Sequence, residues 1–195
     1  MTNSQKITRV IDPIPADDGR YRTQDEWIEF FNEERKAMMS GHDVYRAPDS
    51  VLQSFREDFR TNYGLITNTS ISYNPNDLKA RIIQDFGSTI VTPKETSLVV
   101  PVYRDEQVEK VAKGEGLKYL QTLFDTEDDA SKLIGRLEEI SEKEAKDILI
   151  WTPDETGRGE QSKRAVDFGF YHGRFRVGGG WCDYGRARGV SVKSA

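Results

Sequence analysis

The hydrophobic periodicity of this chain changes several times along its length, and this pattern constrains the fold more than any other feature. Apolar residues recur at helical spacing in residues 23–63 and again in residues 106–140. Residues 65–73 alternate as strands do, and residues 164–193 lack a helical period. A parallel sheet with crossover helices would need strands and helices in regular alternation. We therefore predict an α+β fold with a mixed central sheet, helices packed mainly on one side, and a β-rich C-terminal segment.

Two helices are predicted in the N-terminal part, residues 23–63. The first begins at Thr23, where Thr23 and Glu26 have the form of a capping box, and should end at Gly41. The second begins just after Pro48. The predicted apolar faces contain Trp27, Phe30, Phe31 and Met38 in the first helix, and Val51, Phe55 and Phe59 in the second.

The middle of the chain mixes both kinds of element. Residues 65–73 predict a strand, and the turn at residues 74–76 should cap a third helix whose apolar face contains Leu78, Ile82, Ile83 and Phe86. Two β-prone runs, residues 89–92 and 97–103, predict a hairpin. Further helices are expected between residues 106 and 140, followed by a buried strand at residues 148–151 and short C-terminal strands joined by glycine turns.

Length and composition favour one domain. The chain has 195 residues, and we expect a flexible N-terminal arm at residues 1–22 followed by a single α+β domain at residues 23–195. No apolar run approaches the ~20 residues that span a bilayer, so no membrane contact is predicted. Cys182 is the one cysteine, which excludes an intramolecular disulfide and favours a reducing, cytoplasmic location. With two histidines and one cysteine, a structural zinc site is not expected either.

Motifs of large enzyme classes are missing. The glycine spacing of residues 157–163 is wrong for a phosphate-binding P-loop. The sequence contains no G-x-S-x-G, H-E-x-x-H or C-x-x-C pattern. We therefore predict no metal and no cofactor, and the sequence favours a protein that is not an enzyme.

Charge is distributed unevenly along the chain. Residues 157–195 contain eight Lys or Arg against three Asp or Glu, a net charge of +5. Because the whole chain carries −5, the remainder is strongly acidic at −10. A basic, β-rich C-terminal part at residues 154–195 therefore follows an acidic body, which permits an anionic partner.

Arginines and aromatic residues crowd into this C-terminal part. On a strand, Arg174 and Arg176 would share one face and Phe175 and Val177 the other. Guanidinium groups match phosphate and carboxylate geometry, and aromatic faces beside them can stack on bases. The predicted anion-binding residues are Arg158, Arg164, Arg174, Arg176, Arg186 and Arg188, with Trp181 and Tyr184 as stacking residues. The competing interpretation is that these arginines form salt bridges with the acidic body.

His172 is the one candidate for catalysis. It lies among these arginines, between Tyr171 and Gly173, and would act as a general acid or base. The alternative is a structural histidine near a turn, just as Cys182 is more simply a small buried side chain.

The leading hypothesis is a non-catalytic binding module whose C-terminal arginine–aromatic surface engages an acidic protein or a nucleic-acid backbone. A second hypothesis is an enzyme that acts on a phosphate- or carboxylate-bearing small molecule, with Arg174 and Arg176 holding the anion. A third is an assembly protein that forms a homo-oligomer by edge pairing of its C-terminal strands.

Overall fold

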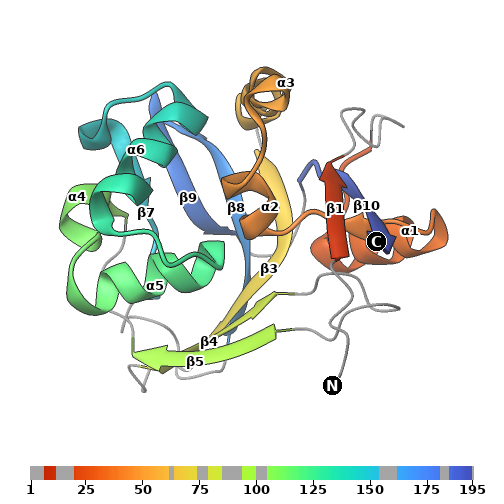
Figure 1. Cartoon of the computed structure of the whole chain (residues 1–195), viewed down its shortest axis with the longest axis horizontal. Coiled ribbons are helices and arrows are strands. Elements are labelled where there is room, and N and C mark those ends of the chain that lie inside the picture. Colours follow the sequence, from red (N-terminus) through yellow and green to blue (C-terminus); the bar gives the residue numbers. More distant parts are fainter. Residues whose placement is uncertain are drawn as a thin grey trace.

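The computed structural model describes residues 7–11, 20–61, 64–73, 79–84, 94–99, 105–153, 162–180 and 185–194. Within these ranges, six α-helices and two β-sheets form a mixed fold (Figure 1), which confirms the predicted α+β class. None of the helices described is both long and apolar enough to cross a lipid bilayer.

The larger sheet has seven strands and is curled. Its strand order is β5-β4-β3-β8-β9-β7-β6, and every neighbouring pair is antiparallel except β7 and β9, which are parallel. The C-terminal strands β8 and β9 therefore lie at its centre. The bounds are β3 Leu65–Tyr73, β4 Lys79–Gln84, β5 Lys94–Val99, β6 Glu106–Gln107, β7 Ile148–Ile150, β8 Ser162–Tyr171 and β9 Arg174–Gly180.

A second, small sheet joins the two ends of the chain in the order β1-β10-β2. Its strands are β1 Ile7–Ile11, β10 Gly189–Ser194 and β2 Ala37–Met38. Strand β1 belongs to the segment for which a flexible arm was expected, and it pairs antiparallel with β10 along its whole length. Figure 1 shows this sheet beside α1, away from α4, α5 and α6.

Helices cover the two faces of the large sheet unequally. The main core packs α2 to α6 against one face and includes Phe55, Phe124, Phe168 and Phe175. A smaller core, which includes Trp27 and Ala165, packs α1 against the other face, since Ala165 and Val166 point to opposite sides of β8. The bounds are α1 Gln24–Glu33, α2 Gly41–Tyr45, α3 Asp49–Phe59, α4 Val108–Val111, α5 Gly114–Phe124 and α6 Ala130–Ser141, with a 3₁₀ turn, η1, at Ala145–Asp147.

The helix predicted around residues 78–86 was wrong, because residues 79–84 form β4 between β3 and β5. The apolar spacing of Ile82 and Ile83 fits a helix, but Ala80, Ile82 and Gln84 also alternate, and these three are the buried ones. A short apolar run fits both periods, and pairing with β3 on one side and β5 on the other decides between them. Residues 89–92 and 100–103 of the predicted hairpin lie outside the described residues.

The end of the first helix was also predicted wrongly. α1 stops at Glu33, and Gly41 is the first residue of α2 instead of the last residue of α1. Ser40 begins α2 with a capping box: its hydroxyl accepts a bond from the Asp43 amide at 3.2 Å, and the Asp43 carboxylate accepts one from the Ser40 amide at 2.8 Å. Met38, expected on the face of α1, lies in β2.

Glycines in β9 are required by close packing. A Cβ at Gly179 would lie 2.4–2.9 Å from atoms of the Trp151 ring, and one at Gly178 would lie 2.4 Å from a carboxylate oxygen of Asp167. Gly178 and Gly179 thus make room for the side chains of Asp167 and Trp151. This packing explains why glycines occupy these two positions, without a bound ligand.

Gly179→Ala should lower the free energy of unfolding by about 1–3 kcal/mol, because the new methyl group overlaps the buried ring. Gly135→Ala is the matched control: nothing lies within 4 Å of a Cβ on this residue of α6. It should raise the free energy of unfolding by about 0.5–1 kcal/mol. Urea unfolding of the two variants measures both changes, and equal effects would contradict the packing argument.

Candidate anion-binding groove

The arginines predicted on β9 share one face, but each has an acidic neighbour. Arg176 donates from Nε to Oδ1 of Asp105 at 2.6 Å. Nε of Arg174 lies 4.0 Å from Oδ1 of Asp147, and both side chains are well exposed. The two guanidinium groups therefore face different carboxylates instead of one shared anion.

Arg188 and Arg186 both approach Asp58 of α3. Arg188 is buried, with 2% of its side chain exposed, and donates from Nε to Oδ2 of Asp58 at 2.6 Å. It also donates to the hydroxyl and the backbone carbonyl of Ser54 at 3.1 and 3.0 Å. Nη1 of Arg186 lies 3.7 Å from Oδ1 of Asp58 in a more exposed position. Asp58 thus holds a guanidinium of the C-terminal part inside the protein.

The remaining predicted residues have different positions. Arg164 is buried on β8, while Arg158, Trp181 and Tyr184 lie outside the described residues, as does Cys182. His172 has a left-handed backbone (φ 48°) in the exposed turn between β8 and β9, where its ring lies 4.3 Å from that of Tyr171. Neither His172 nor the two arginines of β9 line the two hollows described below.

Arg188→Met should lower the free energy of unfolding by about 3–5 kcal/mol, since it leaves the Asp58 carboxylate buried beside fewer donors. Arg186→Met removes a longer, partly exposed contact with the same carboxylate and should cost less than about 1 kcal/mol. Chemical denaturation of both variants gives the comparison. A cost for Arg188→Met as small as that for Arg186→Met would show that the buried pair is not what joins these elements.

A pair of connected hollows lies between α2, α5, α6 and β5. The smaller, called the recess here, has a volume of about 260 Å³ and is lined by Tyr45, Arg46, Asp128, Lys132 and Arg136. The larger, called the outer groove, has a volume of about 720 Å³ and is lined by Arg46, Thr96, Leu98, Lys118, Gln121, Thr122, Asp125, Thr126, Glu127 and Asp128. Because Arg46 and Asp128 line both, the recess and the outer groove adjoin at these two residues.

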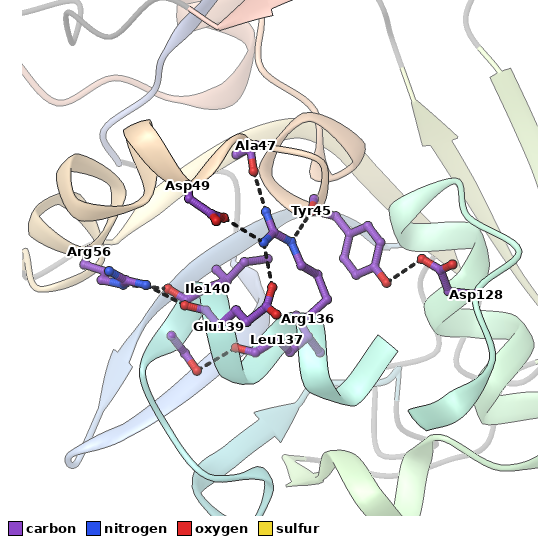
Figure 2. A network of polar contacts seen from close by, with 10 residues as sticks. Tyr45, Ala47, Asp49, Arg56, Asp128, Arg136, Leu137, Glu139 and Ile140 are labelled. Atoms are coloured by element: carbon purple, nitrogen blue, oxygen red, sulfur yellow. Dashed lines mark hydrogen bonds and ion pairs between the residues drawn. The ribbon is translucent and has the colours of Figure 1, made fainter. Parts of the chain in front are cut away.

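Arg136 forms a fixed wall of the recess, as Figure 2 shows. From α6 it donates to the carbonyl of Tyr45 at 2.8 Å and to the carbonyl of Ala47, at the C-terminal end of α2. Helix ends leave such carbonyls without helical partners and carry partial negative charge, so a guanidinium is favourable there. Its Nη1 also lies 2.8 Å from Glu139 and 3.4 Å from Asp49. The Arg136 side chain therefore cannot swing away from the recess without losing these bonds.

Asp128 is held at the junction of the two hollows. Its Oδ2 accepts hydrogen bonds from the Tyr45 and Thr126 hydroxyls, both at 2.9 Å, the first of which is drawn in Figure 2. These bonds hold the pKa of the Asp128 carboxyl below its ordinary value, with the Tyr45 bond as the largest cause. Burial, and the bond to Asp128, raise the pKa of Tyr45. At neutral pH, Asp128 is therefore ionised and Tyr45 is protonated.

Arg46 and Lys132 are the adaptable cations of the recess. Arg46 donates to the Thr126 hydroxyl at 3.0 Å and lies 3.8 Å from Asp128, with 53% of its side chain exposed. Lys132 is exposed, and its amine has no ion pair within the described ranges. Arg136 is already paired with Glu139 and Asp49, so Arg46 and Lys132 are the two cations that remain near the Asp128 carboxylate. These two side chains supply the positive charge that a small anionic group in the recess would meet.

Sequence reasoning missed this site. Arg46 and Asp128 are more than 80 residues apart, and no local pattern links them. The spacing of Lys132 and Arg136, four residues apart on one helix face, was the one available signal for a basic patch there. The neighbouring Asp129 has a different role from Asp128, because its carboxylate caps α6.

Comparisons with known proteins give no guide to function, so the geometry of the recess and the outer groove is the main evidence. No protein-family model matches the chain, and no significant match exists among curated protein sequences or among solved structures. Among the described residues, no three His, Cys, Asp or Glu side chains cluster in a way that would hold a metal ion.

Tyr45→Phe should raise the pKa of Asp128 toward its ordinary value and cost about 1 kcal/mol of stability at neutral pH. Because the folded pKa of Asp128 is lowered, its contribution is present above the unfolded pKa of about 3.9 and is lost as pH falls through the folded value. The stability difference between wild type and variant should therefore shrink from pH 6 to pH 3. Carboxyl NMR titration measures the pKa of Asp128, and urea unfolding measures the stability difference at each pH. Tyr171→Phe, at an exposed tyrosine, is the control. A stability difference that stays constant from pH 6 to pH 3 would contradict the prediction.

Proposed function

We propose that this protein is a non-catalytic binding module that takes an anionic group of its partner into the recess beside Arg46. The single observation behind this proposal is that Arg46, Lys132 and Arg136 line one small recess together with a single carboxylate, Asp128, which already accepts two hydrogen bonds. Guanidinium and ammonium groups bind carboxylates or phosphates with charge-assisted hydrogen bonds. Arg136 supplies a wall held in place by its own hydrogen bonds, and the exposed Arg46 and Lys132 can turn toward the bound group. We therefore propose the recess, instead of the C-terminal arginines, as the anion-binding site.

A binding role is favoured over catalysis by the direction of the pKa shifts. A general acid or base works best with a pKa near the operating pH. Asp128 and Tyr45, the recess groups with shifted pKa values, move away from neutrality in opposite directions. Such groups keep their charge states and serve as fixed structural groups. His172 lines neither hollow.

An acidic protein segment fits the site better than a nucleic-acid backbone does. Asp125 and Glu127 line the outer groove next to the recess, and Lys118 there is paired with Glu115 at 2.9 Å. A backbone with a phosphate at every nucleotide would place further negative charges beside these carboxylates. A polypeptide with one acidic side chain between neutral ones avoids that repulsion.

A capped Gly-Glu-Gly tripeptide and inorganic phosphate are suitable probes, because both are too short to reach beyond the recess. NMR titration of the full chain should show shifts at Arg46 and Lys132 that weaken as salt rises from low to physiological levels. The double variant Arg46→Gln, Lys132→Gln should bind the tripeptide about tenfold more weakly, which corresponds to ~1.4 kcal/mol. Arg174→Gln, on the hairpin between β8 and β9, is the matched control and should bind like wild type.

This titration tests both the location of the anion-binding site and the class of the partner. Loss of binding in Arg174→Gln with none in the double variant would overturn the recess and return the site to the C-terminal surface. Tighter binding of a ten-residue oligothymidylate than of the tripeptide, lost in the double variant, would overturn the choice of an acidic protein as partner.

A further inference from the structure

Strand β5 ends the large sheet and has an open edge. It pairs along its whole length with β4, and no described segment pairs with its other side. Natural proteins usually protect such edges with charges, prolines, bulges or covering segments. β5 begins with the charged residues Lys94 and Glu95, but residues 96–99 are Thr, Ser, Leu and Val, and Val99 is one of the exposed large apolar side chains. This edge therefore offers unpaired backbone donors and acceptors beside uncharged side chains.

The same strand forms one wall of the outer groove. Thr96 and Leu98 point into the groove and are partly buried, whereas Glu95, Ser97 and Val99 are exposed on the opposite face. The other wall comes from α5 and the turn that follows it, from Lys118 to Asp128. A strand added to β5 would lie about 4.8 Å away, and alternate side chains would then enter the groove. The groove adjoins the recess at Arg46 and Asp128.

We propose that the partner is an extended peptide segment that pairs with the free edge of β5 and places one Asp or Glu side chain in the recess. This inference rests on the proposed function and names its partner. Backbone hydrogen bonds to β5 would supply much of the affinity, and the side chains that enter the groove would supply specificity. Arg46, Lys132 and Arg136 select the acidic residue, while Asp125 and Glu127 disfavour acidic neighbours on the same face.

A second copy of this chain is a poorer occupant of the same edge. Antiparallel pairing of β5 with its own copy would present Thr96 and Leu98 to the groove, and both are neutral. The carboxylate in the described side chains of β5, Glu95, is already paired with Arg81 of β4. Self-pairing would therefore leave the cations of the recess without a matching charge.

The test uses a fluorescent, capped nonapeptide of alternating Thr and Val residues with a central Glu. In fluorescence anisotropy, the matching Gln peptide should bind the full chain about tenfold more weakly. N-methylation of alternate amides removes hydrogen-bond donors from one edge of the peptide. It should abolish binding when it falls on the edge that faces β5 and should have no effect on the other edge. Hydrogen exchange at the amides of residues 95–99 should slow in the complex.

The outcomes separate this inference from the function on which it rests. If both N-methylated peptides bind equally well and the Glu preference persists, pairing with β5 is overturned while the anionic recess stands. Equal binding of the Glu and Gln peptides, together with no response to the Gly-Glu-Gly tripeptide, would overturn both. A concentration-dependent dimer in sedimentation, with residues 95–99 protected in the absence of peptide, would overturn the peptide partner in favour of a second copy.

Discussion

The buried ion pair between Arg188 and Asp58 joins the two cores of this protein. Asp58 comes from α3, which belongs to the main core, and Arg188 precedes β10, next to the residues of the smaller core. A buried charge is tolerated only with matched partners, and here Ser54 supplies the remaining acceptors at 3.0 and 3.1 Å. The backbone carbonyl of Arg188 also accepts a bond from the Met39 amide. One residue thus links α3, the entry to β10 and the segment before α2, so the small sheet is held in place relative to the main core.

Arginine side chains also order the helices around the recess. Arg56 of α3 donates to the last carbonyls of α6, at Glu139 and Ile140, while Arg136 of α6 donates to the carbonyls that end α2 (Figure 2). Each guanidinium satisfies backbone acceptors that a helix end leaves open. The consequence is that α2, α3 and α6 are joined at one corner, beside which the Tyr45 hydroxyl bonds to Asp128. The proposed anion site therefore rests on the same contacts that pack α2, α3 and α6 together.

Much of the fold could be predicted because its signals are local. The capping box of Thr23 and the helical stripes of α3, α5 and α6 involve residues within one or two turns of each other, and these elements formed as expected. Prediction failed at β4, where Ile82 and Ile83 fit both a helix and a strand. It failed again after Glu33, where a new capping box at Ser40 starts another helix. In the first case pairing with β3 and β5 decided the outcome, and the apolar spacing of the segment itself does not show that pairing.

The sequence by itself determined the α+β class, the helical stripes, the β-rich C-terminal strands and the excess of arginine near that end. Which charges meet depends on the folded chain. Arg176 and Arg188 pair with internal carboxylates, whereas Arg46 lies in one recess with Lys132 and Arg136, although more than 80 residues separate it from them. Helix caps and hydrophobic periodicity act between residues a few positions apart, but the balance of charge in a site depends on side chains that are distant in the sequence and close in the fold.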